Sequence, residues 1–186
     1  LDYIELHIFA DEHIGDEHCD MQSLHDRIEY VRNNPNAYCV LNGDLMDNAT
    51  KTSIGDTYAN VFNPMEQLAR AVELFEPIKD KILCITHGNH ETTWSESGGK
   101  DFEHLWGHNG CTTARVGEYL FVAFPAGPYV KMADGTAQDS ARLKWVENQL
   151  KKGERGKIIS ICHYPLNGDL TNRDQVTSLM KRYGVS

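Results

Sequence analysis

Four short apolar runs in this chain are each followed by side chains of the kinds that bind metal ions. The runs cover residues 4–10, 37–41, 82–86 and 158–162, and the polar residues that follow them include Asp11, His13, Asp44, Asn89 and His163. In open α/β sheets, ligands bind outside the carboxyl ends of the strands. We therefore expect these side chains to meet at one shared metal centre.

The residue types in this set suit two cations that share a ligand. Asp11 and His13 are two residues apart, so on a strand both side chains would point to one face and reach one metal. Asp44 has two carboxylate oxygens and can bridge two ions. Oxygen and imidazole ligands without thiolate suit Mn, Fe or Zn. Two ions about 3.5–4 Å apart form a clamp for in-line displacement at phosphorus, with a bridging hydroxide as the nucleophile.

Formal charges favour an anionic substrate at this centre. Two divalent ions bring about +4, and two aspartates and a bridging hydroxide remove about 3, which leaves about +1. This local charge attracts a phosphoester even though the whole chain carries a formal charge of −9. His90 follows Asn89 directly and is placed to protonate the leaving oxygen as a general acid.

The order and spacing of these residues resemble the signature of the calcineurin-like metallophosphoesterase family. The signature reads D-x-H, G-D-x-x-D, G-N-H-E and a later histidine before a proline, and it corresponds here to 11–13, 43–47, 88–91 and 163–165. The resemblance covers most of the chain. The asparagine-rich second motif, 42–48, looks most like bacterial and phage-borne members.

The resemblance implies a role for each matching position. The first metal would be held by Asp11 and His13, the second by Asn89 and His163, and Asp44 would bridge the two. His90 would steady the phosphate and protonate the leaving group, while Asp47 and Glu91 would orient the ligands. The implied fold is a four-layer α/β/β/α sandwich in which two mixed sheets are flanked by helices. The implied cofactors are two divalent ions, with Mn expected and Fe or Zn compatible.

The chain departs from the family pattern in ways that narrow the prediction. The family's G-H-x-H motif does not follow His163, so each metal would lack one protein ligand. We expect residues 1–186 to form a single metallophosphoesterase domain that is truncated at its C-terminus. Asp47 replaces the tyrosine of purple acid phosphatases, and Asn48-Ala49 replaces the Arg-Gly of protein serine/threonine phosphatases, so both branches are disfavoured.

Periodicity predicts the elements that must position these residues. Helices are expected at 20–33, from Asn63-Pro64 to about Pro77, at 139–152 and at 172–183, a hairpin at 115–124, and a strand at 157–162. In the second helix we expect a buried stripe made by Met65, Leu68, Val72 and Phe75. The polar loops 48–63 and 91–110 are expected to border the site and to select the substrate.

The composition of the chain disfavours some classes of partner and some cellular locations. The 27 acidic residues outnumber the 18 basic ones, so nucleic acid is not favoured as a partner. The five cysteines are irregularly spaced, which indicates a reducing, cytoplasmic compartment. We expect no membrane segment, because no apolar stretch reaches the roughly 18 residues of a span. The sequence leaves the oligomeric state open.

The sequence therefore predicts a metal-dependent phosphoesterase that hydrolyses a monoester or a diester. One alternative is a nuclease of the kind found in phage and in DNA repair. Another is a catalytically weak metal-site scaffold that binds a partner protein. The presence of His90 favours chemistry, whereas the missing G-H-x-H motif favours the scaffold.

Overall fold

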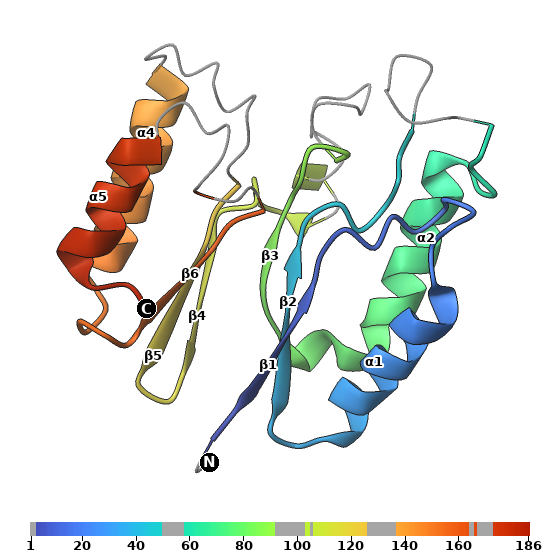
Figure 1. The fold of residues 1–186 in the computed structure, drawn as a ribbon, viewed down its shortest axis with the longest axis horizontal. Helices are drawn as coiled ribbons and strands as arrows, with labels where there is room; N and C mark the ends of the chain where they lie inside the picture. The colour runs from blue at the N-terminus through green and yellow to red at the C-terminus, as the bar shows by residue number, and fades with distance from the viewer. Residues whose placement is uncertain are drawn as a thin grey trace.

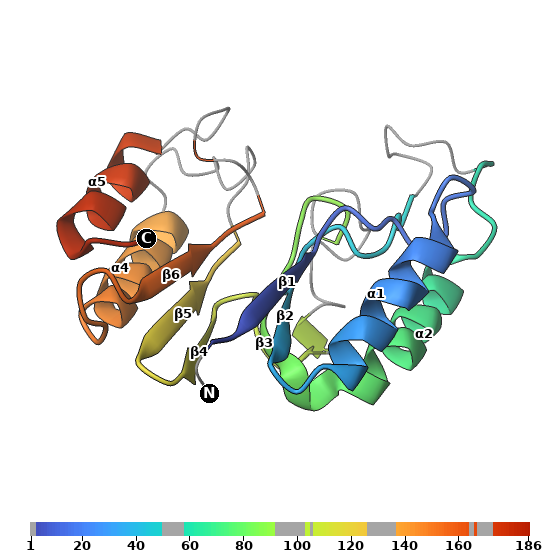
Figure 2. The ribbon, with the colours of Figure 1, turned by 60° about the horizontal axis from the view of Figure 1, so that its bottom comes forward.

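Two three-stranded sheets pack face to face between two pairs of helices (Figure 1). The computed structural model describes residues 3–49, 58–91, 103–104, 106–125, 137–163, 166 and 173–186. Most of the predicted loops 48–63 and 91–110, with Tyr164 and Pro165, lie outside these residues. Viewed in a second orientation, the layers follow one another as helices, sheet, sheet, helices (Figure 2). The predicted four-layer α/β/β/α sandwich is therefore confirmed.

The first sheet consists of three parallel strands in the order β1-β2-β3. Their bounds are Glu5–Phe9 for β1, Ala37–Asn42 for β2 and Ile82–Thr86 for β3. The helices α1 (Met21–Asn33) and α2 (Pro64–Phe75) cover its outer face, and the 3₁₀ helix η1 (Glu76–Lys81) leads into β3. Phe9, Leu24, Ile28, Leu41 and Phe75 belong to the core between these layers.

The second sheet has the order β4-β5-β6, and only this sheet is mixed in the described part of the chain. The strands β4 (Thr112–Val116) and β5 (Tyr119–Ala123) form the predicted hairpin, and β6 (Ile158–Ile161) pairs with β5 in parallel. The helices α4 (Ala137–Leu150) and α5 (Arg173–Tyr183) cover its outer face. The expectation of two mixed sheets thus holds for this sheet, while the first is parallel over its described strands.

An apolar layer between the two sheets fixes their relative position. Val40 and Cys84 of the first sheet pack there against Phe121, Ala123 and Ile161 of the second. All five are buried. This packing brings the end of β6 toward the loops that follow β1, β2 and β3, which is what a site built from both sheets requires.

The start of α2 matches its sequence signature. The side chain of Asn63 accepts a hydrogen bond from the Glu66 N–H at 3.0 Å, and the Glu66 carboxylate accepts one from the Asn63 N–H at 3.0 Å. Pro64 occupies the first turn. The predicted capping box is confirmed, and it sets where the helix begins relative to the loop before it.

The predicted buried stripe of α2 is wrong at two of its four positions. Met65 is 72% exposed and Val72 is 37% exposed, whereas Gln67 is fully buried. The buried face is instead formed by Gln67, Ala71 and Phe75. Relative to the prediction, α2 is rotated so that Gln67 faces the interior, because the Gln67 amide binds polar groups of the neighbouring loops. A prediction from apolar periodicity does not take such hydrogen bonds into account.

The remaining features concern the cysteines and the helices as a whole. All five cysteines are free thiols, with Cys39 and Cys84 buried and Cys162 half-buried. Among the helices that the structure describes, none combines the length and the apolar character needed to cross a bilayer.

Replacing the cap residue tests the account of α2. Asn63→Ala removes the side-chain acceptor at the helix start, so it should destabilise the protein by about 1 kcal/mol. In a chain of this size that corresponds to a fall of about 2–4 °C in the unfolding midpoint. Thermal denaturation of Asn63→Asp, which keeps an acceptor, is the control. Equal melting of the parent and Asn63→Ala would contradict the capping role.

Candidate metal centre

The loops that follow the parallel strands meet at one edge of the first sheet. Asp11 and His13 follow β1, Asp44 follows β2, and the loop containing His90 follows β3. The Asp11 N–H donates to the Gly43 carbonyl at 3.2 Å, and the His13 N–H donates to the Asp44 carbonyl at 3.1 Å. These main-chain bonds hold the first two loops side by side, as the strand-end argument predicted.

The backbone is strained at the predicted ligands. Among the described non-glycine residues, φ is positive only at Asp11 (55°), His13 (49°), Asp44 (49°) and Asn48 (49°). Asp, Asn and His tolerate the left-handed region better than other non-glycine residues. Such strain persists where the surrounding structure enforces it, and it is typical of functional sites.

Two glycines allow the loops after β2 and β3 to touch. A Cβ on Gly43, whose φ is +80°, would lie 2.4 Å from the backbone nitrogen of Gly88. A Cβ on Gly88 would lie 2.0 Å from Oδ1 of Asp44. Neither distance leaves room for a side chain. The glycines of the second and third motifs therefore let the Asp44 carboxylate lie directly against the third loop.

The side chains at this edge form two groups of metal-ligand atoms. In one group the ligand atoms of Asp11, Asp44 and His163 lie within 4.8 Å of one another, and the other group joins those of His13, Asp47 and His90. The groups are adjacent, because Nε2 of His90 in one group is 3.9 Å from Oδ2 of Asp44 in the other. Asn89 lies one residue before His90 in the third loop.

His163 is held so that one ring nitrogen faces the centre. Its Nδ1 lies 2.8 Å from the carbonyl oxygen of Asn42 and donates to it, so Nε2 faces Oδ2 of Asp44 at 3.1 Å. Burial opposes the charged form, but the hydrogen bond and the charge of Asp44 outweigh it and raise the pKa of His163 to about 9. The same contact lowers the pKa of Asp44 although burial of its carboxylate acts to raise it.

His90 is oriented by the loop after β2. Its N–H donates to Oδ1 of Asp44 at 2.9 Å, and its Nδ1 is hydrogen-bonded to the main-chain carbonyl of Asp47. A carbonyl only accepts, so Nδ1 carries a proton and Nε2 carries a second proton only in the imidazolium form. Burial lowers the pKa of His90, and the carboxylates of Asp44 and Asp47 oppose that shift.

The Glu91 carboxylate joins the second and third loops. It accepts hydrogen bonds at 2.9 Å from the backbone N–H groups of Asp44, Leu45 and Gly88. Burial and the charge of Asp44 raise the pKa of Glu91, while these N–H donors act to lower it. Glu91 is 4% exposed and contacts the backbone of the ligand loop, and the orienting role that the resemblance implied stays a prediction.

The donor set fits a divalent cation. Carboxylate oxygens and imidazole nitrogens make up the two groups found among the described residues. Because Nδ1 of His163 donates to the Asn42 carbonyl, Nε2, which now lies beside Asp44, is the nitrogen that would face a metal. The carboxylate of Asp47 offers a ligand atom within 4.8 Å of those of His13 and His90, so Asp47 can contact a cation as well as orient the His13 ring. Sequence reasoning missed Asn60, whose side chain donates to Asp47 at 2.8 Å, because it lies in a loop without periodicity.

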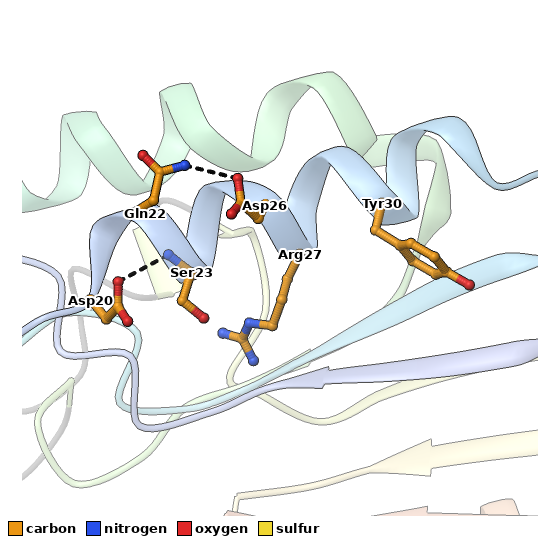
Figure 3. Close-up of a pocket in the computed structure, with 6 residues that line it drawn as sticks. All are labelled: Asp20, Gln22, Ser23, Asp26, Arg27 and Tyr30. Carbon is orange, nitrogen blue, oxygen red and sulfur yellow. Dashed lines mark hydrogen bonds between the residues drawn. The ribbon is translucent and has the colours of Figure 1, made fainter.

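A hollow of about 500 Å³ opens beside the centre. Its lining includes Asp11, His13 and Asp47 together with Glu12, Asp16, Asp20 and Arg27. Arg27 is paired with Glu12 and stacks over the Phe9 ring, so its charge is already partly compensated. A second hollow of about 510 Å³ runs along α1 and shares Asp20, Ser23 and Arg27 with the first (Figure 3).

Comparison with known families agrees with this geometry. The family model for calcineurin-like phosphoesterases matches residues 13–186. The match covers most of the chain, and the chain belongs to this family. No curated protein gives a significant match.

A methyl group on Gly88 should disrupt the centre. Gly88→Ala places Cβ against Asp44, so the carboxylate must move, and we expect Mn²⁺ affinity in a calorimetric titration to fall by about 10- to 100-fold. Gly117→Ala is the matched control, because its Cβ meets no atom within 4 Å. Gly117→Ala should lower the free energy of unfolding, because φ at position 117 is positive, and it should leave the Mn²⁺ affinity unchanged. Unchanged affinity in Gly88→Ala would contradict the close approach of the loops.

The raised pKa of His163 predicts opposite pH trends for stability and metal affinity. Because the folded pKa of about 9 exceeds the usual 6.5, the His163–Asp44 pair stabilises the metal-free protein fully below about pH 6.5 and is lost as pH rises through about 9. A metal needs the neutral imidazole, so Mn²⁺ affinity should rise across the same window.

Thermal melts of metal-stripped protein and Mn²⁺ titrations at several pH values measure both trends. His163→Asn is the control, since its metal-free stability should vary less with pH in that window. If the stability of the metal-free parent and that of His163→Asn change with pH in the same way, the His163–Asp44 ion pair is not the cause of the pH dependence.

Proposed function

We propose that this calcineurin-like phosphoesterase domain hydrolyses a small phosphomonoester or phosphodiester with the help of two divalent cations. The observation that supports two cations is the pair of adjacent ligand groups, in which Asp44 belongs to one group and also lies beside His90 of the other. Oδ2 of Asp44 is 3.1 Å from Nε2 of His163 and 3.9 Å from Nε2 of His90, so this carboxylate faces both groups. Mn is the metal we expect, and Fe and Zn suit the same donors.

Specific residues would hold each cation. Asp11, Asp44 and His163 would hold one, and His13, Asp47 and the shared Asp44 would hold the other. This assignment differs from the predicted pairing of Asp11 with His13, because the two residues follow the end of β1 and their side chains belong to different ligand groups. Asn89, predicted to share a metal with His163, would contribute its carbonyl oxygen. When bound, the cations neutralise phosphate charge and lower the pKa of a water molecule so that hydroxide is available as a nucleophile near neutral pH. The loops hold these ligands in place through the hydrogen bonds of Glu91.

His90 is the proposed general acid. Its Nδ1 is committed to the Asp47 carbonyl, so the proton it can give is the one on Nε2 of the imidazolium. Burial lowers the pKa of His90, Asp44 and Asp47 oppose that shift, and an anionic phosphoester beside the ring would favour the charged form. The ring of His90 is buried and its Nδ1 is held by a hydrogen bond, so it can present Nε2 to a leaving oxygen without being displaced.

The charge of the hollow supports a small substrate over nucleic acid. Five acidic residues, namely Asp11, Glu12, Asp16, Asp20 and Asp47, line the space beside the centre. Bound cations would offset those nearest the metals, but a long polyanion would still meet the others and an overall charge of −9.

We propose a cytoplasmic location as well, which the five free thiols support.

The function is tested by turnover of mono- and bis-p-nitrophenyl phosphate with and without Mn²⁺. We expect release of p-nitrophenol that requires the metal, and no comparable cleavage of single-stranded DNA. Metal-loaded, folded protein that turns over neither ester would contradict the enzyme proposal and favour a scaffold. Preferential cleavage of DNA would instead favour the nuclease.

His90→Ala separates acid catalysis from metal binding. Loss of a general acid lowers kcat by about 10²–10⁴-fold, and the loss should be larger for phenyl phosphate than for p-nitrophenyl phosphate, whose leaving group needs less protonation. Mn²⁺ stoichiometry should be retained. An equal loss for both leaving groups would exclude proton donation by His90.

A further inference from the structure

Two amide side chains outside the predicted ligand set connect α2 to the metal centre. Asn60, in the loop before α2, donates from Nδ2 to Oδ2 of Asp47 at 2.8 Å. The other carboxylate oxygen, Oδ1, lies 3.3 Å from Nδ1 of His13. With one oxygen held by Asn60, the other faces the His13 ring. A carboxylate at Nδ1 directs Nε2 of a histidine toward a metal.

Gln67 fixes the direction in which the Asn60 amide points. Oε1 of Gln67 accepts from the Asn48 N–H at 2.7 Å, and Nε2 donates to the Phe62 carbonyl at 2.9 Å. These main-chain partners determine which end of the Gln67 amide is oxygen and which is nitrogen. Nε2 also donates to Oδ1 of Asn60 at 2.8 Å, so the nitrogen of Asn60 must face Asp47.

The backbone around Gln67 is shaped to admit its side chain. A Cβ on Gly15, whose φ is +112°, would lie 2.4 Å from Cδ of Gln67. The loop of Asn60 is tied to the same segment, because the Val61 N–H donates to the Gly15 carbonyl at 2.8 Å. Three loops therefore meet around one fully buried amide.

The groups around Gln67 call for an amide at this position. The neighbours of Gln67 on the buried face of α2 are Ala71 and Phe75, and a buried polar group costs free energy unless it is hydrogen-bonded. An apolar residue of similar size would remove the partner of the Asn48 N–H and of the Phe62 carbonyl as well as that of the Asn60 amide. The bonds of the Gln67 amide lead to both sides of Asp47, through Asn48, which follows it in the sequence, and through the side chain of Asn60.

We infer that Asn60 and Gln67 are positioning residues, which hold the Asp47 carboxylate and through it His13 in the orientation that binds the second cation. The inference rests on the proposed function, and it adds two residues that no ligand motif contains. Neither residue lines the hollow beside the centre. Their effect is on the geometry and affinity of the metal site.

Two variants test the inference without relying on activity. Asn60→Asp replaces the donor to Asp47 with an oxygen, and Gln67→Met keeps the volume but removes every hydrogen bond of the amide. We expect both to bind Mn²⁺ about 10- to 100-fold more weakly in calorimetric titrations. The visible absorption spectrum of the Co²⁺-loaded protein, which reports ligand geometry, should also change.

Matched controls make the same kinds of exchange elsewhere. Asn63→Asp keeps the cap of α2, and Gln149→Met lies on α4 beside Lys152, on the far side of the second sheet. Both should have the parent's Mn²⁺ affinity and Co²⁺ spectrum. Thermal melts of metal-free protein should show that Gln67→Met remains folded.

The outcomes separate this inference from the proposed function. If the parent binds Mn²⁺ and the two variants match it in affinity and spectrum, the inference is wrong while the function stands. If neither variant folds without metal, the amides are structural and the inference is again wrong. If the folded parent binds no Mn²⁺, the proposed function fails and the inference fails with it.

Discussion

The constraint on which this structure depends is the burial of the Asp44 carboxylate, which is 3% exposed and lies close to a second buried carboxylate, Glu91. A buried anion is tolerated only when it is paired or hydrogen-bonded. Asp44 is compensated by the N–H of His90 and by the ring of His163. Glu91 is compensated by backbone N–H groups, including that of Asp44 itself. The loops after β2 and β3 therefore have to converge to accommodate Glu91, and the loop after β6 of the second sheet has to join them to accommodate Asp44.

This requirement explains the local features of the fold. The positive φ angles at Asp11, His13 and Asp44 turn the chain after β1 and β2, where these residues enter the site. Gly88 lets the third loop touch Asp44. The apolar layer between the sheets then brings β6 close enough for His163 to reach the same carboxylate. Cations at this edge would relieve the repulsion between the acidic groups, which is why the geometry suits metal binding.

The sequence predicted the parts of the site that follow from local patterns. Asp11, Asp44 and His163 could be placed at strand ends because apolar runs mark the strands, and the α2 cap was evident from Asn63, Pro64 and Glu66. The four layers followed from the family resemblance. The buried face of α2 could not be predicted, because Gln67 is held there by contacts with loops rather than by apolar packing. The pairing of His13 with Asp47, 34 residues apart, likewise depends on tertiary contacts.

The most direct test of the account is an anomalous difference map from crystals of the folded protein grown with Mn²⁺. The account predicts two peaks about 3.5–4 Å apart, one on each side of the Asp44 carboxylate. A single peak remote from Asp44, or no peak at Mn²⁺ concentrations that support phosphoester turnover, would contradict it.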